Sequence, residues 1–472
     1  MALSAGLAFW LWSIFQLPKP PVPMIDPFRL TDVVIINPMI DRSGPTSMSV
    51  SEGVVRVGAV AEGAKELSKY EGMFVLPGFI DMHSHLPNDN VLKLTQHYGL
   101  LHLKHGVTTV RDAGDLDGTS VPAARGLIAR GAPFPQLISC GPFVSHNVTV
   151  WPNTIRIAAA DEAAEVVEAI ADQGHDCVKA YEGLTPDLIR AIVKAAEERG
   201  MHVIGHVPAD YTLEEAGIPD VQHFFGVPEP DTLGGDSVTF RNGDWSGVDD
   251  DRLDDIVSFV SENRVRNTPT LMTLYHFLGF LEYEAASAEA RKLMPAIFAD
   301  VVWNPETGLP VYRDIPEARL RAARDALSKK QVLAKRLSDA GAILHLGTDA
   351  GQPFTAPGAS FWIEMRLFEQ AGISPEQVLA YATNVPANSL GTDSGRVFDG
   401  SPADFLIFKE DPTNTLDALS SLQAVVIGGR LYTKPQLDVA IERSLSHYAA
   451  WPLNVISERA AQRTVDETAK NF

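Results

Sequence analysis

Short apolar runs alternate with longer amphipathic stretches through the middle of the chain. From Val75 onward, eight strand-like runs, such as VLPGFIDMHSH, VTTVRDAG and DCVKAY, are separated for the most part by helical patterns such as TPDLIRAIVKAAEERG. Strands that alternate with helices are typical of parallel βαβ units. Eight units in roughly 300 residues are what a closed (β/α)8 barrel needs. We therefore predict an α/β fold with a TIM-like barrel over residues 75–390.

The chain is β-rich on both sides of this region. The runs DVVIINPMI and GVVRVGAV precede it, and DFLIF and AVVIGGRLYT follow it. This arrangement predicts one small β-sandwich domain built from both termini, with residues 24–74 and 391–440 as its two parts. The segment 273–340 is longer than one crossover requires, so we expect extra helices there that cover the site. Residues 441–472 are predicted to form a helical C-terminal tail.

The first residues form an apolar segment and a proline-rich linker, together residues 1–23. Residues 2–17, ALSAGLAFWLWSIFQL, carry no charge and precede PKPPVP. A spanning helix needs about 20 apolar residues, and the segment lacks the features of a cleavable signal. It is either a membrane anchor or an apolar helix packed on the protein or on a neighbouring subunit. We expect membrane association through residues 2–17, a membrane-anchored or periplasmic (extracytoplasmic) rather than cytoplasmic location, and a homo-oligomer.

Charge and cysteine content exclude some function classes. Lys plus Arg is 39 and Asp plus Glu is 60, so the net charge is −21. This balance repels phosphate backbones, so we expect a small-molecule substrate and no nucleic acid. Two cysteines are too few for a disulfide framework or a Cys-rich zinc site. We expect Cys140 and Cys177 to be buried thiols rather than a bridge.

Candidate chemistry gathers where the predicted strands end. In a barrel of this class the C-terminal ends of the strands share one rim, and the chemistry lies there. Positions i and i+2 of a strand face the same side, so two histidines of the first strand point together. Imidazole and carboxylate ligands suit zinc or a similar divalent ion. The residues at this rim are His83, His85, Lys179, His206, His223 and Asp349.

The ordered motifs resemble those of the amidohydrolase superfamily of metal-dependent hydrolases. They are VLPGFIDMHSHLP, GVTTVRDAG, VKAY, GHV, QHF and GTDAG, followed by TNVPANSLG and DGSPADFLIF. The resemblance covers roughly residues 30 to 435. Within the superfamily, the sequence is most similar to the imidazolonepropionase-like branch, which includes Xaa-Pro dipeptidases. Lys179 favours a resemblance to the dipeptidase-like members, in which a carboxylated lysine bridges two metal ions. Imidazolonepropionase uses one metal ion and has no such lysine.

The resemblance implies a ligand set and a mechanism. One ion would be held by His83, His85 and Asp349, the other by His206 and His223, and a carboxylated Lys179 would bridge both. The expected cofactors are thus two divalent metal ions, with Zn²⁺ preferred. A metal-bridging hydroxide would attack the scissile carbonyl, and Asp349 would be the catalytic acid–base residue that passes the proton to the leaving group.

The expected activity is cleavage of an amide or peptide bond in a dipeptide or an N-acyl amino acid. An alternative keeps the metals but acts on a lactone, ester or cyclic amide, and a remote alternative is a non-catalytic barrel that serves as a binding module. We name four candidate substrate contacts: His146, Tyr181, Tyr275 and His276. The three histidines of the segment 97–105, His97, His102 and His105, are expected to be surface or packing residues.

Overall fold

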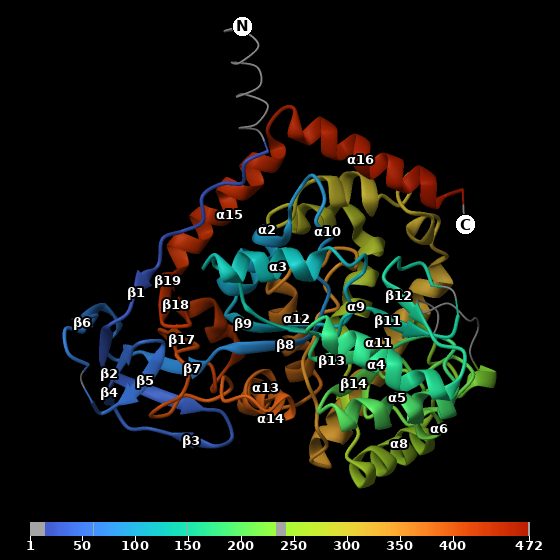
Figure 1. Ribbon diagram of the computed structural model, residues 1–472, viewed down its shortest axis with the longest axis horizontal. Helices are drawn as coiled ribbons and strands as arrows, with labels where there is room; N and C mark the ends of the chain where they lie inside the picture. Colours follow the sequence, from blue (N-terminus) through green and yellow to red (C-terminus); the bar gives the residue numbers. More distant parts are fainter. Residues whose placement is uncertain (1–14, 60, 148, 233–241, 471–472) are drawn as a thin grey trace, which may run out of the picture.

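The computed structural model describes residues 15–59, 61–147, 149–232 and 242–470. Two sheet regions are visible in Figure 1. Strands from both ends of the chain form the sheet on the left, and strands from the middle of the chain form a curled region at the centre and right, which helices surround.

The left-hand sheet joins the two ends of the chain. Its strand order is β1-β19-β18-β17-β7-β2-β4-β5, with β3 and β6 paired to β2. β7 runs antiparallel to β17, and Leu76 lies opposite Leu406. Phe28 of β2 shares a buried core with Phe405 and Ile407 of β17. A separate sheet domain with strands from both termini is therefore observed. Its strands form one ten-stranded sheet, and the second sheet of the predicted sandwich is not seen among the described residues.

The bounds of these strands are β1 Met24–Ile25, β2 Phe28–Asn37, β3 Asp41–Arg42, β4 Thr46–Ser51, β5 Val54–Val57, β6 Lys65–Glu66, β7 Phe74–Pro77, β17 Phe405–Phe408, β18 Leu422–Ile427 and β19 Arg430–Thr433.

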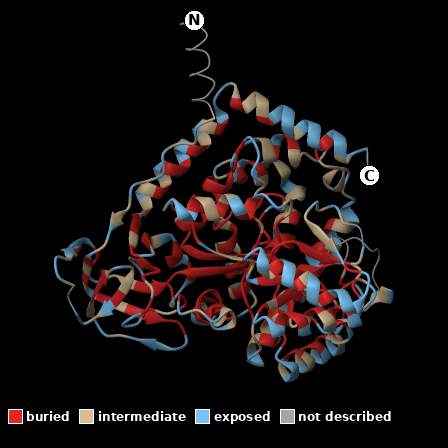
Figure 2. Cartoon of the chain, viewed as in Figure 1, coloured by how far each residue is buried: buried red, intermediate tan, exposed pale blue. Residues whose placement is uncertain are grey.

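Two parallel sheets form the curled region. The first has the order β10-β9-β8 and the second the order β12-β11-β13-β14-β15-β16. Their bounds are β8 Phe79–Ser84, β9 Val107–Asp112, β10 Gln136–Ser139, β11 Phe143–Ser145, β12 Thr154–Arg156, β13 Cys177–Ala180, β14 His202–Gly205, β15 Asp220–Gln222 and β16 Arg266–Thr268. Strands β8, β9 and β13 are buried at every residue, as Figure 2 shows in red at the centre of the molecule. Burial of both faces is typical of parallel sheets covered by helices.

The predicted eighth strand takes an irregular form. Leu344 makes a single parallel bridge with Asn267 of β16, and Met82 of β8 donates a backbone hydrogen bond to the carbonyl of Leu346. This segment therefore lies between the two sheets. A TIM-barrel-like fold is supported, but the ladders among the described residues do not close into one continuous barrel. The last residues of the segment fold over the end of β8 instead of extending a ladder.

Gly78 separates two strands that the sequence predicts as one. β7 belongs to the sheet built from the termini, whereas β8 belongs to the curled region. A Cβ atom at Gly78 would lie 1.9 Å from Oγ1 of Thr108. Only glycine therefore fits where the chain passes from one sheet to the other beside β9.

Helices cover the curled region. α5 shows why they form: Thr185 caps it by accepting a hydrogen bond from the Leu188 N–H, Pro186 occupies its first turn, and Ile189 and Ile192 are buried on one face. The helices are α2 Thr95–Lys104, α3 Ser120–Ala129, α4 Ala163–Asp172, α5 Pro186–Glu198, α6 Leu213–Ala216, α8 Asp250–Asn263, α9 Leu271–Phe277, α10 Tyr283–Ala290, α11 Glu317–Asp339, α12 Ala359–Gln370, α13 Pro375–Ala382, α14 Asn384–Leu390, α15 Lys434–Ala449 and α16 Leu453–Thr468. The segment 273–340 does hold additional helices, which include α10 and α11.

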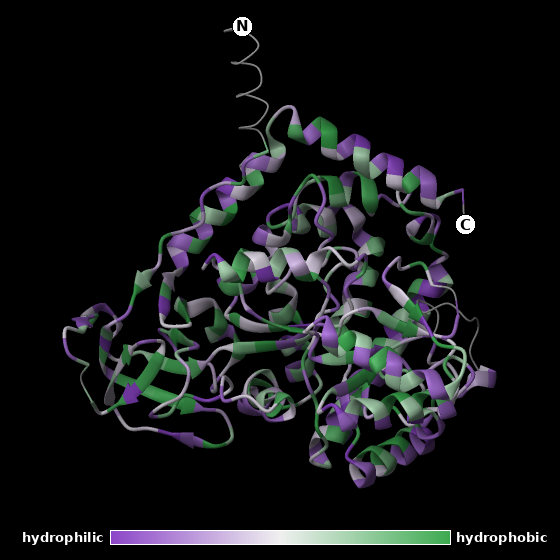
Figure 3. Ribbon diagram, in the orientation of Figure 1, coloured by the Kyte–Doolittle hydropathy of each residue, from purple (hydrophilic) through white to green (hydrophobic). Residues whose placement is uncertain are grey.

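The expectation of membrane association is corrected. Across the described ranges, no helix combines the length and the apolar character that crossing a membrane requires. Of the segment 2–17, on which the expectation depended, residues 2–14 lie outside the described residues. The linker that follows runs along α15, where Gln436 donates a hydrogen bond to the carbonyl of Val22. In Figure 3 α15 and α16 alternate between hydrophilic and hydrophobic colours.

The two cysteines were expected to be thiols, and this was wrong. Cys140 and Cys177 form a disulfide across 37 residues of sequence. Cys140 follows β10 and Cys177 begins β13, and the Asp176 N–H donates a hydrogen bond to the Ser139 carbonyl beside the bridge. The disulfide thus joins the three-stranded sheet to the six-stranded one.

Candidate metal centre

His83, His85 and Asp349 converge at the end of β8. Nε2 of His83 lies 3.3 Å from Oδ1 of Asp349, and Nε2 of His85 lies 3.2 Å from the same oxygen. One ligand atom from each residue falls within 4.8 Å of the others. The three side chains could therefore hold one metal ion.

The backbone at Asp349 explains why its carboxylate reaches these histidines. Asp349 has φ 50°, in the left-handed region that non-glycine residues rarely adopt. Its N–H and that of Thr348 both donate hydrogen bonds to the carbonyl of His83, at 2.6 and 2.8 Å. The turn folds the chain over β8 and brings the carboxylate to the two imidazoles.

Two further histidines lie beside this group. His206 directly follows β14 and His223 directly follows β15. The ring centroids of His83 and His223 are 4.6 Å apart, and those of His206 and His223 are 5.0 Å apart. The structure therefore brings all four predicted histidine ligands together.

Lys179 of β13 is buried in the same region. Its side chain is almost inaccessible, at 1% exposure, and within the described part of the chain its Nζ has no hydrogen-bond partner. Burial lowers the pKa of Lys179 to about 7, and the charge of Asp349 opposes this shift. An amine that loses its proton near neutral pH can act as a nucleophile or take a new substituent.

Each of the four histidines hydrogen-bonds through Nδ1. The partners are the Gln222 side-chain oxygen for His83 at 2.6 Å, the Gly114 carbonyl for His85 at 3.0 Å, a Glu182 carboxylate oxygen for His206 at 3.0 Å, and the Thr270 hydroxyl for His223 at 2.6 Å. A proton held on Nδ1 by an acceptor leaves the Nε2 lone pair available to a metal. Sequence analysis missed Gln222, Glu182 and Thr270.

The partners of two histidines are themselves oriented. The amide nitrogen of Gln222 donates to Oδ1 of Asp220 at 2.6 Å, so its oxygen faces His83. The Thr270 hydroxyl donates to the Pro269 carbonyl at 2.8 Å, so its oxygen accepts from His223. These bonds assign the Nδ1–H tautomer to both rings.

Arg111 is the last member of the series of hydrogen-bonded side chains that runs from His83 through Gln222 and Asp220. It is buried and donates to Asp220 at 2.8 Å. Burial alone would raise the pKa of Asp220, but the charge and hydrogen bond of Arg111, together with the charges of His345 and Arg266, lower it to about 2. Asp220 therefore stays ionised and keeps its hold on the Gln222 amide.

Electrostatics favour the ligand forms of His83, His223 and Asp349, whereas the pKa of His85 is raised, because burial, which lowers it, is outweighed mainly by Asp349. Burial, together with the charge of Lys179, lowers the pKa of His83 to about 4, and burial holds the pKa of His223 well below its usual value. Burial would raise the pKa of Asp349, but the adjacent side chains of His83 and His85 hold it well below the usual range. Neutral imidazoles and an ionised carboxylate are the forms that bind metals.

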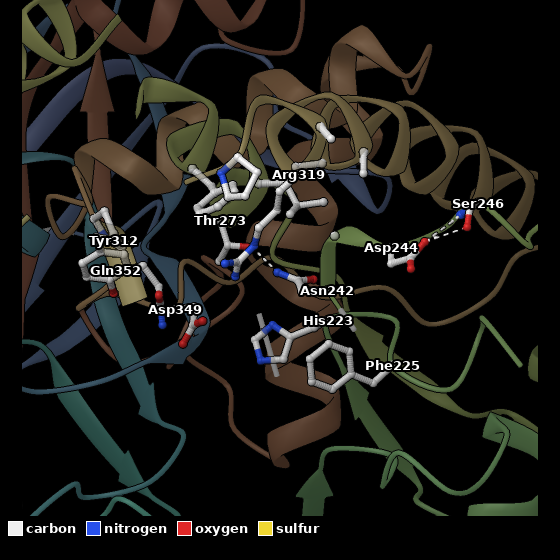
Figure 4. A pocket seen from close by; sticks show the side chains of 18 residues that line it. His223, Phe225, Asn242, Asp244, Ser246, Thr273, Tyr312, Arg319, Asp349 and Gln352 are labelled. Carbon is white, nitrogen blue, oxygen red and sulfur yellow. Dashed lines mark hydrogen bonds between the residues drawn. The ribbon is translucent and has the colours of Figure 1, made fainter. Parts of the chain in front are cut away.

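A cavity of about 490 Å³ opens beside this group. His223 and Asp349 line it together with Phe225, Phe277 and other residues of α9 and α11 (Figure 4). This volume is sufficient for a small organic molecule. The cavity therefore lies next to two of the candidate ligands, His223 and Asp349.

The four predicted substrate contacts are scattered. Tyr181 lies against the His206 ring at 4.7 Å, and its hydroxyl accepts a hydrogen bond from Trp151. His146 is half-buried and hydrogen-bonds to the Ile157 carbonyl. Tyr275 and His276 line a different cavity of about 540 Å³. None of the four lines the 490 Å³ cavity as the described residues define it.

Asp112 is another buried carboxyl near the histidines. Its Oδ1 accepts a hydrogen bond from the Leu86 N–H at 3.1 Å. Burial raises its pKa to about 7, although the charge of His85 opposes the shift. Asp112 is absent from the described lining of the 490 Å³ cavity, whereas Asp349 borders it. Asp349 is thus the better placed of the two to reach a bound molecule.

Comparison with known proteins gives a family match. The model of the amidohydrolase family matches residues 74–432, which is more than half of the chain. No curated protein shows a significant sequence match.

Three solved structures illustrate the similarity in fold. A bottromycin amidohydrolase has a TM-score of 0.67 and 22% identity, with 92% of each chain covered. A Xaa-Pro dipeptidase with bound methionine in the active site has a TM-score of 0.62 and 17% identity, covering 86% of this chain and 100% of the other. The A. niger ochratoxinase has a TM-score of 0.60 and 15% identity, covering 87% and 96%.

Proposed function

The chain belongs to the amidohydrolase family, and from this premise we propose that it is a binuclear metal-dependent hydrolase that cleaves an amide or peptide bond in a small substrate. The family makes it a hydrolytic enzyme that acts on C–N bonds. The number of metal ions, the role of Lys179 and the substrate class go beyond the family match and are proposed.

The observation that carries the proposal is the shared orientation of the four histidines. All four use Nδ1 within the protein, and Nε2 of His83 and Nε2 of His85 lie 3.3 and 3.2 Å from Oδ1 of Asp349. Nε2 of His83 and Nζ of Lys179 have no hydrogen-bond partner among the described residues. Buried polar atoms of this kind carry a free-energy cost unless something binds them. The donor set therefore fits divalent ions.

The residues divide into two groups around Lys179. His83, His85 and Asp349 would hold one ion, and His206 and His223 would hold the other. A neutral lysine amine between two cations would be a weak ligand, whereas a carboxylated Lys179 offers two anionic oxygens. Its lowered pKa supports this modification, because only the neutral amine reacts with carbon dioxide. Zn²⁺ is the ion that imidazole and carboxylate ligands suit best.

Divalent ions at such a site polarise the scissile carbonyl and lower the pKa of water. The chain's own contribution is proton transfer and positioning. Asp349 borders the cavity and remains ionised, so it can accept the proton of the attacking water and pass it to the leaving nitrogen. The Nδ1 hydrogen bonds keep the imidazoles fixed while this happens.

The substrate class is proposed as a dipeptide or an N-acyl amino acid. One of the structural neighbours is a Xaa-Pro dipeptidase and another is an amidohydrolase, and both support amide cleavage. The same site chemistry on a lactone, ester or cyclic amide is the second candidate, because attack at any of these carbonyls needs the same groups.

A substrate panel tests the proposal. Purified protein loaded with Zn²⁺ in bicarbonate buffer is assayed against dipeptides, N-acyl amino acids, lactones and esters, and its metal content is measured. We expect close to two equivalents of metal and turnover of amide substrates. Turnover confined to lactones or esters would favour the second candidate. At most one equivalent of metal, or no turnover at all, would contradict the proposal.

A further inference from the structure

Two buried residues of opposite charge lie behind the candidate metal ligand His223. Lys330 of α11 is 1% exposed, and Glu364 of α12 is fully buried. Burial lowers the pKa of Lys330 and raises that of Glu364, and the charge of each residue opposes the shift of the other. Burying two charges carries a free-energy cost that their attraction does not always offset. The hydrogen bonds of the two side chains show what they hold in place.

Lys330 holds the backbone of His223. Its Nζ donates a hydrogen bond to the His223 carbonyl at 2.8 Å and a second one to the side-chain oxygen of Asn242. His223 has φ 62°, in the left-handed region, and its N–H donates to the carbonyl of Thr268 at 2.9 Å. A non-glycine residue keeps such a conformation only where its surroundings fix it. The Lys330 ammonium therefore helps to hold the turn that sets the direction of the His223 ring.

Glu364 holds the turn that carries the hydrogen-bond partner of this ring. Its two carboxylate oxygens accept hydrogen bonds from the N–H groups of Leu271 and Met272, at 3.0 and 2.7 Å. These are the first two residues of α9, and Thr270, which precedes them, has φ 49°. A threonine at this position usually caps the helix with its own hydroxyl. The Thr270 hydroxyl instead lies 2.6 Å from Nδ1 of His223 and makes no cap bond. Glu364 thus replaces the cap and leaves the Thr270 hydroxyl to His223.

Asn242 links the two arrangements to the cavity. It accepts a hydrogen bond from Lys330 and donates one to the Thr273 hydroxyl of α9 at 3.0 Å. His223, Asn242 and Thr273 all line the 490 Å³ cavity (Figure 4), whereas Lys330 and Glu364 are absent from its lining as the described residues define it. The two charged side chains can therefore act on a bound ion only through His223.

We propose that Lys330 and Glu364 are positioning residues for His223, and that the ion held by His206 and His223 depends on them. This inference rests on the proposed binuclear centre and specifies how one of its two sites is oriented. Lys330 fixes the main chain of His223, and Glu364 fixes the turn whose hydroxyl accepts the Nδ1 proton. A ring held at both places presents Nε2 in one direction. Among the described residues, neither Lys330 nor Glu364 hydrogen-bonds to a candidate ligand of the other ion.

Zinc affinity tests the proposal. Lys330→Met removes the ammonium and keeps the length of the side chain, and Glu364→Gln removes the charge and one of the two acceptors. Competition with a chelator gives a dissociation constant for each of the two ions. We expect each variant to raise one constant by roughly 10- to 100-fold and to leave the other nearly unchanged. The affected ion should be the one that His206→Ala fails to bind, and excess Zn²⁺ should restore most of the lost turnover.

Lys329→Met is the matched control. Lys329 precedes Lys330 on α11 and donates to the carbonyls of Trp245 and Val248, at 2.7 and 2.6 Å. It makes the same kind of bond to a different segment, so its loss should change neither zinc constant. Thermal unfolding checks that all variants remain folded. The double variant Lys330→Met/Glu364→Gln leaves neither buried charge without its partner, and it takes the place of a single variant that does not fold.

The His223 ring in metal-free protein separates this inference from the proposed function. NMR spectra of protein with isotopically labelled histidine show which ring nitrogen carries the proton, and the His223 signals are assigned by their loss in His223→Gln. We expect the Nδ1–H form in the wild type and in Lys329→Met, and a loss of this form in Lys330→Met and Glu364→Gln.

The outcomes of the two measurements are distinguishable. If the wild type binds fewer than two ions or hydrolyses no amide, the proposed function fails, and the ring signals still decide the positioning role. Unchanged His223 signals in Lys330→Met and Glu364→Gln would overturn that role even in an active enzyme with two metal ions. Equal weakening of both ions, or of neither, would overturn it as well.

Discussion

Nδ1 of His83 lies 2.6 Å from the side-chain oxygen of Gln222, deep in the curled region. Gln222 is held in turn by Asp220, which is paired with Arg111. The orientation of one candidate metal ligand is therefore set by three side chains that never face the cavity. Such partners fix the tautomer and direction of a ligating imidazole.

Replacing Gln222 should weaken metal binding without removing a ligand. Gln222→Met keeps a side chain of similar length but cannot accept the proton of Nδ1, so the His83 ring can rotate or change tautomer. We expect the affinity for Zn²⁺ to fall by roughly 10- to 100-fold, measured by competition with a chelator. Gln423→Met, on β18 of the sheet built from the termini, is the control. Unchanged affinity in Gln222→Met would contradict this account of the hydrogen bond.

Lys179 provides a direct test of the second metal site. Lys179→Ala removes the buried amine, so the carboxylated form cannot arise and no group bridges the two ions. We expect activity to be lost and metal content to fall from two equivalents to one, with partial rescue of activity by short carboxylic acids such as acetate.

Metal analysis and kinetics on the same preparation check this prediction. Lys194→Ala, which removes an exposed lysine of α5, should keep full activity and metal content. A Lys179→Ala protein with both metals and full turnover would show that Lys179 has no bridging role.

Sequence reasoning located the candidate ligands because their signal is local. His83 and His85 share strand parity, and the other candidates follow or lie within apolar runs, so chain order alone brings them to one rim. The groups behind them carry no such signal. Gln222 and Glu182 look like ordinary polar residues at the ends of strands, and only packing between elements shows that they contact histidines.

The same distinction explains what sequence reasoning missed elsewhere. Cys140 and Cys177 are separated by 37 residues, and their pairing depends on the neighbouring positions of β10 and β13 in space. Arg319 lies in the first turn of a long amphipathic helix with several other arginines, and nothing in the helical pattern distinguishes the one that lines the cavity. Contacts between distant segments decide both features.

Histidines away from the site should make the stability of the fold depend on pH. His102 is buried in α2, and among the described residues neither of its ring nitrogens has a hydrogen-bond partner. Burial lowers its pKa to about 3, against about 6.5 in the unfolded chain. Between these values the unfolded chain binds a proton that the folded chain does not, so the free energy of unfolding decreases as the pH falls below about 6.5.

The variant His102→Leu isolates this contribution. Each pH unit below 6.5 costs the wild type about 1.4 kcal/mol at this site, which is about 2 kcal/mol at pH 5. We therefore expect the variant to gain about 2 kcal/mol relative to the wild type between pH 7 and pH 5, measured by urea unfolding. Between pH 7 and pH 8 the difference should stay constant, because His102 is neutral in both states. If the difference in free energy of unfolding between His102→Leu and the wild type is the same at pH 5 and pH 7, His102 does not have the lowered pKa that this prediction requires.

Asp349 should act as the proton shuttle as well as a ligand. It borders the cavity, contacts both His83 and His85, and its pKa is held well below the usual range, so it is ionised and able to accept a proton. A base in this position contributes roughly 10²- to 10⁴-fold to the rate. Asp349→Asn can still coordinate weakly through its amide oxygen, but it cannot accept the proton.

We therefore expect kcat of Asp349→Asn to fall by at least this factor while much of the metal remains bound. Measuring kcat and metal content on the same sample separates the two roles, because loss of both together would indicate a ligand only. Asp112→Asn is the informative comparison. Its carboxyl is buried with a pKa raised to about 7 and accepts a backbone hydrogen bond, so an amide can replace it with a much smaller effect on kcat. Near-normal turnover in Asp349→Asn, or a collapse in Asp112→Asn with metal retained, would transfer the role of base from Asp349 to Asp112.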